Sequence, residues 1–161
     1  MSQAVSALAA VTAVLTALAL RRSRQTAAQG YLGGARALRA QLPLLLAAFI
    51  LAGYVEVLLP ADLVQAWLGA GAGLRGIVIG GLAGAILPFG PYIVFPMAAA
   101  VRATGAGDAT LVAFVAGWML LSTGRIAYEM AAFGPGFTWR RLALFGPAAL
   151  AAGGLALLLG R

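Results

Sequence analysis

The sequence has 161 residues, of which 63% are hydrophobic and only 9% are charged, and its mean hydropathy is +0.98. A soluble domain carries roughly 25% charged residues, so this composition excludes a soluble globular protein and predicts an all-α integral membrane protein embedded in the lipid bilayer. The net charge of +7 comes from arginines that mostly flank apolar segments, where they set membrane topology. We therefore expect no nucleic-acid partner.

Cysteine and histidine are absent, and only four residues are acidic. Thiol chemistry, haem ligation by histidine and nearly all zinc sites are thereby excluded. So few titratable groups leave little for acid–base catalysis. We expect no enzyme activity, no cofactor and no metal.

The apolar segments are long enough to cross a membrane. Taken in chain order, the expected spans are residues 3–20, 42–59, 74–101 (interrupted), 109–131 and 142–160. Together they form a single transmembrane domain over residues 1–161, with four to five helices. Residues 21–40 carry five arginines and are predicted to form a cytoplasmic loop, which places the N-terminus outside. Tyr31–Gly34 is expected to break any helix in this loop. The protein is predicted to be a multi-pass protein of the bacterial inner (plasma) membrane.

The segment 74–101 contains an interruption at Leu87–Pro96. Pro88, Pro91 and Pro96 each remove a backbone donor, and Gly90 adds conformational freedom. Broken helices in membranes leave backbone groups unpaired, and such breaks form binding sites in transporters. A proline-kinked helix that only packs is the alternative, since proline is common in membrane helices.

Each half of this segment is about a dozen residues, or about 18 Å as a helix, which reaches only about the bilayer midplane. The segment either crosses as a broken helix or doubles back as a re-entrant hairpin. Both versions place the same number of arginines inside, so charge does not decide between them. Three prolines and a glycine within ten residues favour the reversal. In the first half, Gly76, Gly80 and Gly84 predict a smooth packing face.

The span 109–131 contains Ser122, Thr123, Arg125 and Glu129. Arg125 and Glu129 lie four residues apart on one helix face and either pair with each other or support a pathway. Ser122 and Thr123 could extend that polar face, but hydroxyl bonds to carbonyls of their own helix are the expected arrangement.

Residues 84–100, Gly-Ala-Ile-Leu-Pro-Phe-Gly-Pro-Tyr-Ile-Val-Phe-Pro-Met-Ala-Ala-Ala, resemble the signature of the YraQ-type predicted permeases, a family that includes organoarsenical efflux permeases. The likeness extends through Trp118, Arg125, Glu129 and the turn Gly134–Arg141, over roughly residues 74–145. Family members are about twice this length and carry two such motifs. The resemblance therefore implies a half-size permease that works as a homodimer. The organoarsenical branch carries cysteine beside the matching proline, which this chain lacks.

These observations predict transport of a small solute or ion through a site at the broken helix. The alternative is a structural or interaction subunit of a larger membrane complex, with the glycine faces as docking surfaces. The predicted pathway residues are Pro88, Phe89, Gly90, Pro91, Tyr92, Pro96, Ser122, Arg125 and Glu129.

Overall fold

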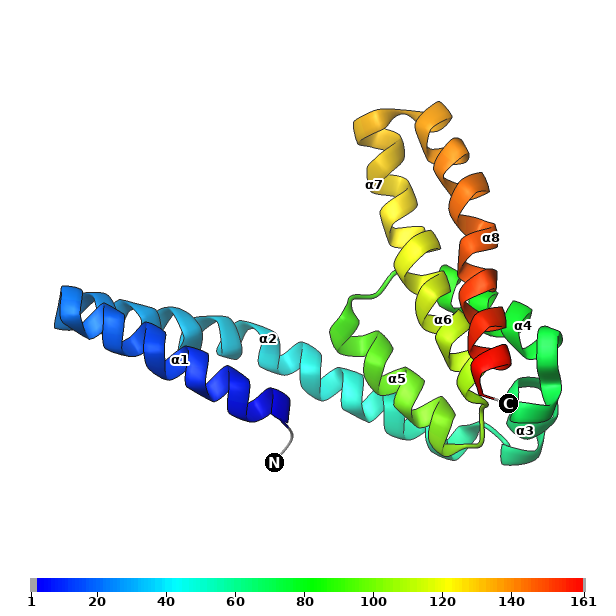
Figure 1. Ribbon diagram of the computed structural model, residues 1–161, viewed down its shortest axis with the longest axis horizontal. Helices are drawn as coiled ribbons and strands as arrows, with labels where there is room; N and C mark the ends of the chain where they lie inside the picture. Colours follow the sequence, from blue (N-terminus) through cyan, green and yellow to red (C-terminus); the bar gives the residue numbers. More distant parts are fainter. Residues whose placement is uncertain (1–2, 161) are drawn as a thin grey trace. The chain divides into compact units, whose positions relative to one another are not determined.

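The computed structural model describes residues 3–160 and shows helices joined by short connections (Figure 1). The elements are α1 (Gln3–Arg22), α2 (Arg24–Leu58), α3 (Ala61–Leu68), the 3-10 turn η1 (Ala70–Ala72), α4 (Gly73–Ile86), α5 (Pro91–Ala103), α6 (Asp108–Leu121), α7 (Thr123–Phe133) and α8 (Pro135–Leu159). About 90% of the chain is helical, and the described residues contain no strand. The all-α prediction is confirmed.

Five helical stretches are long and apolar enough to cross a membrane. They are Val5–Arg22, Arg24–Leu58, Ala61–Ile86, Asp108–Phe133 and Pro135–Leu159. Helix α5 is apolar but has only 13 residues, which is short of the roughly 20 that a spanning helix needs. The protein is therefore a multi-pass membrane protein by the length and hydropathy of its helices.

The chain divides into two compact units, Met1–Pro43 and Leu44–Arg161. In the first unit, α1 and the first part of α2 lie side by side (Figure 1). The connection between them is Ser23, whose Oγ accepts a hydrogen bond from the backbone N–H of Thr26 at 2.9 Å. This bond satisfies a donor at the start of α2 that has no partner within the helix.

Helix α2 is longer than the sequence predicted. It runs without interruption from Arg24 to Leu58, through Tyr31–Gly34 and through Pro43, so the expected loop 21–40 is helical except at Ser23. Each glycine costs a helix about 1 kcal/mol, and an interior proline costs about 3 kcal/mol. Most of the other residues of α2 are alanine, leucine, glutamine and arginine, which favour a helix.

The core of the second unit is built from α4, α6 and α8, and glycines allow their close approach. Gly76 and Gly80 of α4 face Thr110 of α6, and a Cβ added at Gly80 would lie 2.6 Å from the Thr110 carbonyl oxygen. A Cβ at Gly84 would overlap the carbonyl of Phe114. The predicted glycine face is thus confirmed, and it is already buried inside this unit.

Helices α4 and α6 run parallel, because Gly76 and Gly84 match Thr110 and Phe114 in the same order. The end of α5 returns to the level at which α4 begins. There the N–H of Gly107, in the connection from α5 to α6, donates at 2.8 Å to the carbonyl of Leu68, the last residue of α3, from which η1 leads into α4. The segment 74–101 is therefore a hairpin, the alternative favoured by its prolines.

Helices α7 and α8 form a second reversal, visible in yellow and orange in Figure 1. Gly134 turns the chain with φ of 82°, a left-handed conformation that suits glycine. Helix α8 then runs antiparallel to α6. Near its far end, a Cβ at Gly153 would lie 2.8 Å from both Ile77 and Ala113, so all three core helices meet there.

Candidate functional site

The first helix break lies at residues 87–90, between α4 and α5. Leu87 and Gly90 are both extended, with ψ of 118° and 172°. Pro88 lies inside the break, and Pro91 is the first residue of α5, where a missing N–H costs nothing. Phe89 and Gly90 complete it, so four predicted pathway residues form or border this break.

Three side chains from α6, α7 and the connection between them cap the carbonyls that this break leaves free. The Thr123 hydroxyl donates to the Ile86 carbonyl, and the Ser122 hydroxyl donates to the Leu87 carbonyl, each at 2.7 Å. The Trp118 indole N–H donates to the Phe89 carbonyl, also at 2.7 Å. These bonds supply the partners that an unpaired carbonyl requires in a membrane.

The second helix break is at Ser122, inside the stretch that was expected to be one continuous span. Helix α6 ends at Leu121, Ser122 has φ of −44° and ψ of 128°, and α7 begins at Thr123. The expectation that Ser122 and Thr123 bond to carbonyls of their own helix is wrong. The reason is tertiary, because the hairpin places unpaired carbonyls within reach of both hydroxyls.

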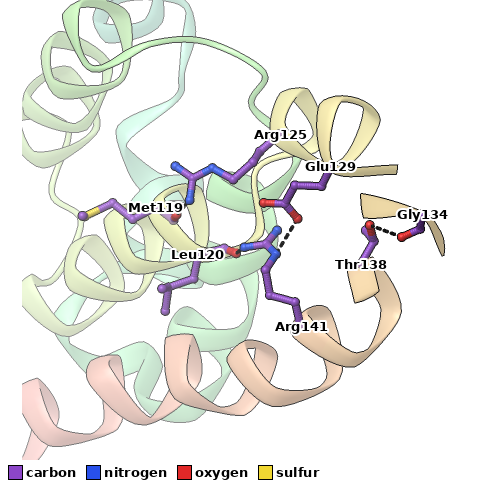
Figure 2. Close-up of polar contacts among 7 residues, drawn as sticks. All are labelled: Met119, Leu120, Arg125, Glu129, Gly134, Thr138 and Arg141. Atoms are coloured by element: carbon purple, nitrogen blue, oxygen red, sulfur yellow. Dashed lines mark hydrogen bonds and ion pairs between the residues drawn. The ribbon is translucent and has the colours of Figure 1, made fainter. Parts of the chain in front are cut away.

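Arginines cap the carbonyls at the end of α6 (Figure 2). Arg125 Nη1 donates to the Met119 carbonyl at 2.9 Å, and Arg141 Nη1 donates to the Leu120 carbonyl at 2.6 Å. Arg125 belongs to α7 and Arg141 to α8, so three helices meet at the second break. Each cationic donor also compensates the negative end of the α6 dipole.

Glu129 pairs with Arg141 and not with Arg125, which corrects the pairing expected from helix spacing. The Arg141 Nε lies 2.6 Å from the Glu129 Oε2, and the two side chains are only 11% and 10% exposed (Figure 2). The turn at Gly134 brings α8 back beside α7 and makes this contact available. A sequence analysis restricted to one helix face could not find it.

The remaining predicted residues lie on α5. Tyr92 is in its first turn and 48% exposed, and Pro96 lies inside the helix. Sequence reasoning missed the roles of Trp118, Thr123 and Arg141. Trp118 also meets Phe95 of α5 edge-to-face, with ring centroids 5.9 Å apart. A tryptophan inside a span, away from the interfaces that it usually prefers, was the available signal.

A shallow, open groove of about 540 Å³ runs along one face of α6, and Arg102 is the single lining residue from α5. Its lining residues are Arg102, Asp108, Leu111, Val112, Val115, Ala116 and Met119. At one end, Arg102 and Asp108 form an exposed ion pair at 2.8 Å. At the other end is Met119, whose carbonyl is held by Arg125 beside the second break. The groove therefore follows the face of α6 from the loop after α5 toward the break.

The two breaks together favour a ligand that accepts hydrogen bonds. Carbonyls at the ends of α4 and α6 are occupied by side-chain donors. Helices α5 and α7 both begin at these breaks, and helix N-termini carry partial positive charge. Among residues 3–160, no three His, Cys, Asp or Glu side chains gather to hold a metal ion.

Comparison of the chain with protein-family models, with curated proteins and with solved structures finds no match.

Proposed function

We propose that this protein is a half-size, YraQ-type permease that moves a small polar or anionic solute across the bacterial inner membrane. The observation that supports it most directly is the meeting of two helix breaks, where the Ser122 hydroxyl reaches the Leu87 carbonyl at 2.7 Å. Irregular backbone within a membrane protein lies against protein or lines a water-filled cavity. Discontinuous helices of this kind hold substrate in transporters.

The proposed pathway follows the groove along α6 toward the breaks. Gly90, in the first break, borders open space, because a Cβ at this position would meet nothing within 4 Å. The carbonyls at the breaks are already capped, and the helix N-termini offer N–H donors. This arrangement favours a solute with a hydrogen-bond acceptor over a cation. A covalent thiol site is excluded, because the chain has no cysteine.

We further propose that the working unit is a homodimer. This rests on the resemblance, since the related permeases carry two motif-bearing halves and this chain has one. A second copy would supply the second half of a two-fold pathway. The membrane orientation with the N-terminus outside belongs to the same proposal and rests on the arginines of residues 21–40.

The alternative, a structural subunit without transport activity, required the glycine face of α4 as a docking surface. That face is buried against α6 in the chain itself, with Gly80 on the Thr110 backbone. The glycine face of α4 is therefore not free to bind another subunit, and permease activity is the better-supported function.

The test combines flux and water access. Purified protein in proteoliposomes is assayed for uptake of inorganic phosphate, sulfate, acetate and glycerol. Gly90→Leu should abolish uptake without unfolding the protein, because its backbone (φ −78°) and surroundings accept a side chain. Gly53→Leu is the matched control, since its Cβ position is equally open.

Water access does not depend on choosing the right solute. Cysteine introduced at Gly90 or Tyr92 should react with a membrane-impermeant thiol reagent, and the chain has no native cysteine to interfere. Unreactive cysteines at both positions, from both sides of the membrane, would show a dry, packed break and would overturn the permease proposal.

A further inference from the structure

Arg141 differs sharply from the residues that precede it. Trp139 and Arg140 are exposed, as expected for a pair of interfacial anchors. The Arg141 side chain is only 11% exposed and points toward α6 and α7 (Figure 2). The three residues are adjacent in the sequence, but the structure separates Arg141 from its two exposed neighbours.

The guanidinium of Arg141 contacts both sides of the second helix break. Its Nη1 donates to Leu120, one residue before the end of α6, at 2.6 Å. Its Nε lies 2.6 Å from the carboxylate of Glu129, in the middle of α7. One rigid, planar group therefore links three helices, a task that suits the fixed fork of arginine better than the single ammonium of lysine.

Separating Arg141 from Glu129 would raise the free energy of the folded protein. Removing one partner of a buried ion pair leaves a charge without compensation, which is strongly unfavourable. The Ser122 carbonyl accepts backbone hydrogen bonds from Arg125 and Ile126, which tie Ser122 to α7. Because the helix is interrupted at Ser122, the angle between α6 and α7 depends on side-chain contacts. Arg125 bonds back to Met119 from the first turn of α7, so Arg141 is the contact that holds α7 further from the break.

We propose that Arg141 is a positioning residue for the transport site: it fixes the angle between α6 and α7 and so holds the two breaks against each other. This inference deepens the proposed function and rests on it for its purpose. The geometric part can be tested without any solute, which separates its failure from a failure of the permease proposal.

The experiment measures distances between pairs of spin labels in the full-length protein. One pair, Val112→Cys with Tyr128→Cys, spans the second break from α6 to α7, and the two sites are about 24 Å apart along a helix axis. A reference pair, Val112→Cys with Leu155→Cys, joins α6 to α8 across the glycine-packed core. All three positions are exposed.

Arg141→Gln should replace the single α6–α7 distance with a broad distribution and leave the α6–α8 distance unchanged. Arg140→Gln, which removes the same charge from an exposed neighbour, should change neither distance. Arg141→Lys retains a charge for Glu129 but not the fork, so it should broaden the α6–α7 distance less than Arg141→Gln does. The Arg141→Lys variant also allows the α6–α7 distance to be measured if Arg141→Gln does not fold.

An unchanged α6–α7 distance in the variants of Arg141 would overturn the proposal. Broadening of both distances would also overturn it, because Arg141 would then stabilise the whole unit and not the break. The two proposals can also fail separately. If the Arg141 variants change only the α6–α7 distance but Gly90→Leu still transports normally, then Arg141 positions the two helices and the proposed transport pathway is wrong.

Discussion

The hydroxyl of Ser122 donates a hydrogen bond to the carbonyl of Leu87 at 2.7 Å, and so joins two helix breaks that are 35 residues apart in the chain. Each break would be unfavourable alone in a membrane, because it exposes unpaired backbone groups. Placed together, the donor side chains at and beside the second break satisfy the carbonyls of the first. The first interruption therefore depends on the second.

The hairpin makes a direct prediction about topology. Cysteines introduced at Gly71, before α4, and at Arg102, near the end of α5, should react with an impermeant thiol reagent from the same side of the membrane. Gly136, in the first turn of α8, should react from the opposite side, because α6 and α7 together are long enough to cross. Reaction of Gly71→Cys and Arg102→Cys from opposite sides would contradict the hairpin.

Packing of α4 on α6 predicts a strong effect at Gly84. Gly84→Ala places a methyl group against the Phe114 carbonyl, and overpacking of this kind costs about 1–3 kcal/mol. Gly154→Ala is the control, since nothing lies within 4 Å of its Cβ position. The free energy of unfolding in mixed detergent micelles should fall for the first variant only, and equal values would show that α4 and α6 pack less closely than described.

Capping across the breaks predicts a difference between two threonines. Thr123→Val removes the donor to the carbonyl of Ile86, an exposed residue at the end of α4, and leaving a carbonyl unpaired in the apolar part of a membrane or micelle costs about 1–3 kcal/mol. Thr12→Val removes a bond to Leu8 within one helix, where the carbonyl keeps its backbone partner. Unfolding measurements should therefore show a loss of stability for Thr123→Val and little change for Thr12→Val.

The buried ion pair predicts strong coupling between Glu129 and Arg141. Replacing either residue alone with glutamine should lower the free energy of unfolding by about 3–5 kcal/mol, because its partner is left charged and buried. Replacing both should cost less than the sum of the two single changes. Arg140→Gln should stay within about 0.5 kcal/mol of the parent protein, as for most exposed positions. Additive single effects would show that the two side chains do not interact.

Composition and periodicity alone determined the class of this protein. Apolar segments of spanning length, few charges and a Gly76–Gly80–Gly84 face led directly to a helical membrane protein with a glycine-packed helix pair. Pro88 and Pro91 located the first helix break, because proline lacks the backbone donor. The break is shorter than the predicted interruption Leu87–Pro96, since α5 begins at Pro91 and continues through Pro96.

Tertiary structure alone decided the contacts of the candidate site. Ser122 interrupts a helix that its own neighbours would continue, since Leu87 and Ile86 offer carbonyls from a different helix. Glu129 pairs with Arg141, twelve residues away, and not with Arg125, four residues away, because the Gly134 turn brings α8 alongside. Helical spacing identifies residues on a common face of one helix. Partners on other helices depend on how the chain folds back, which no local pattern encodes.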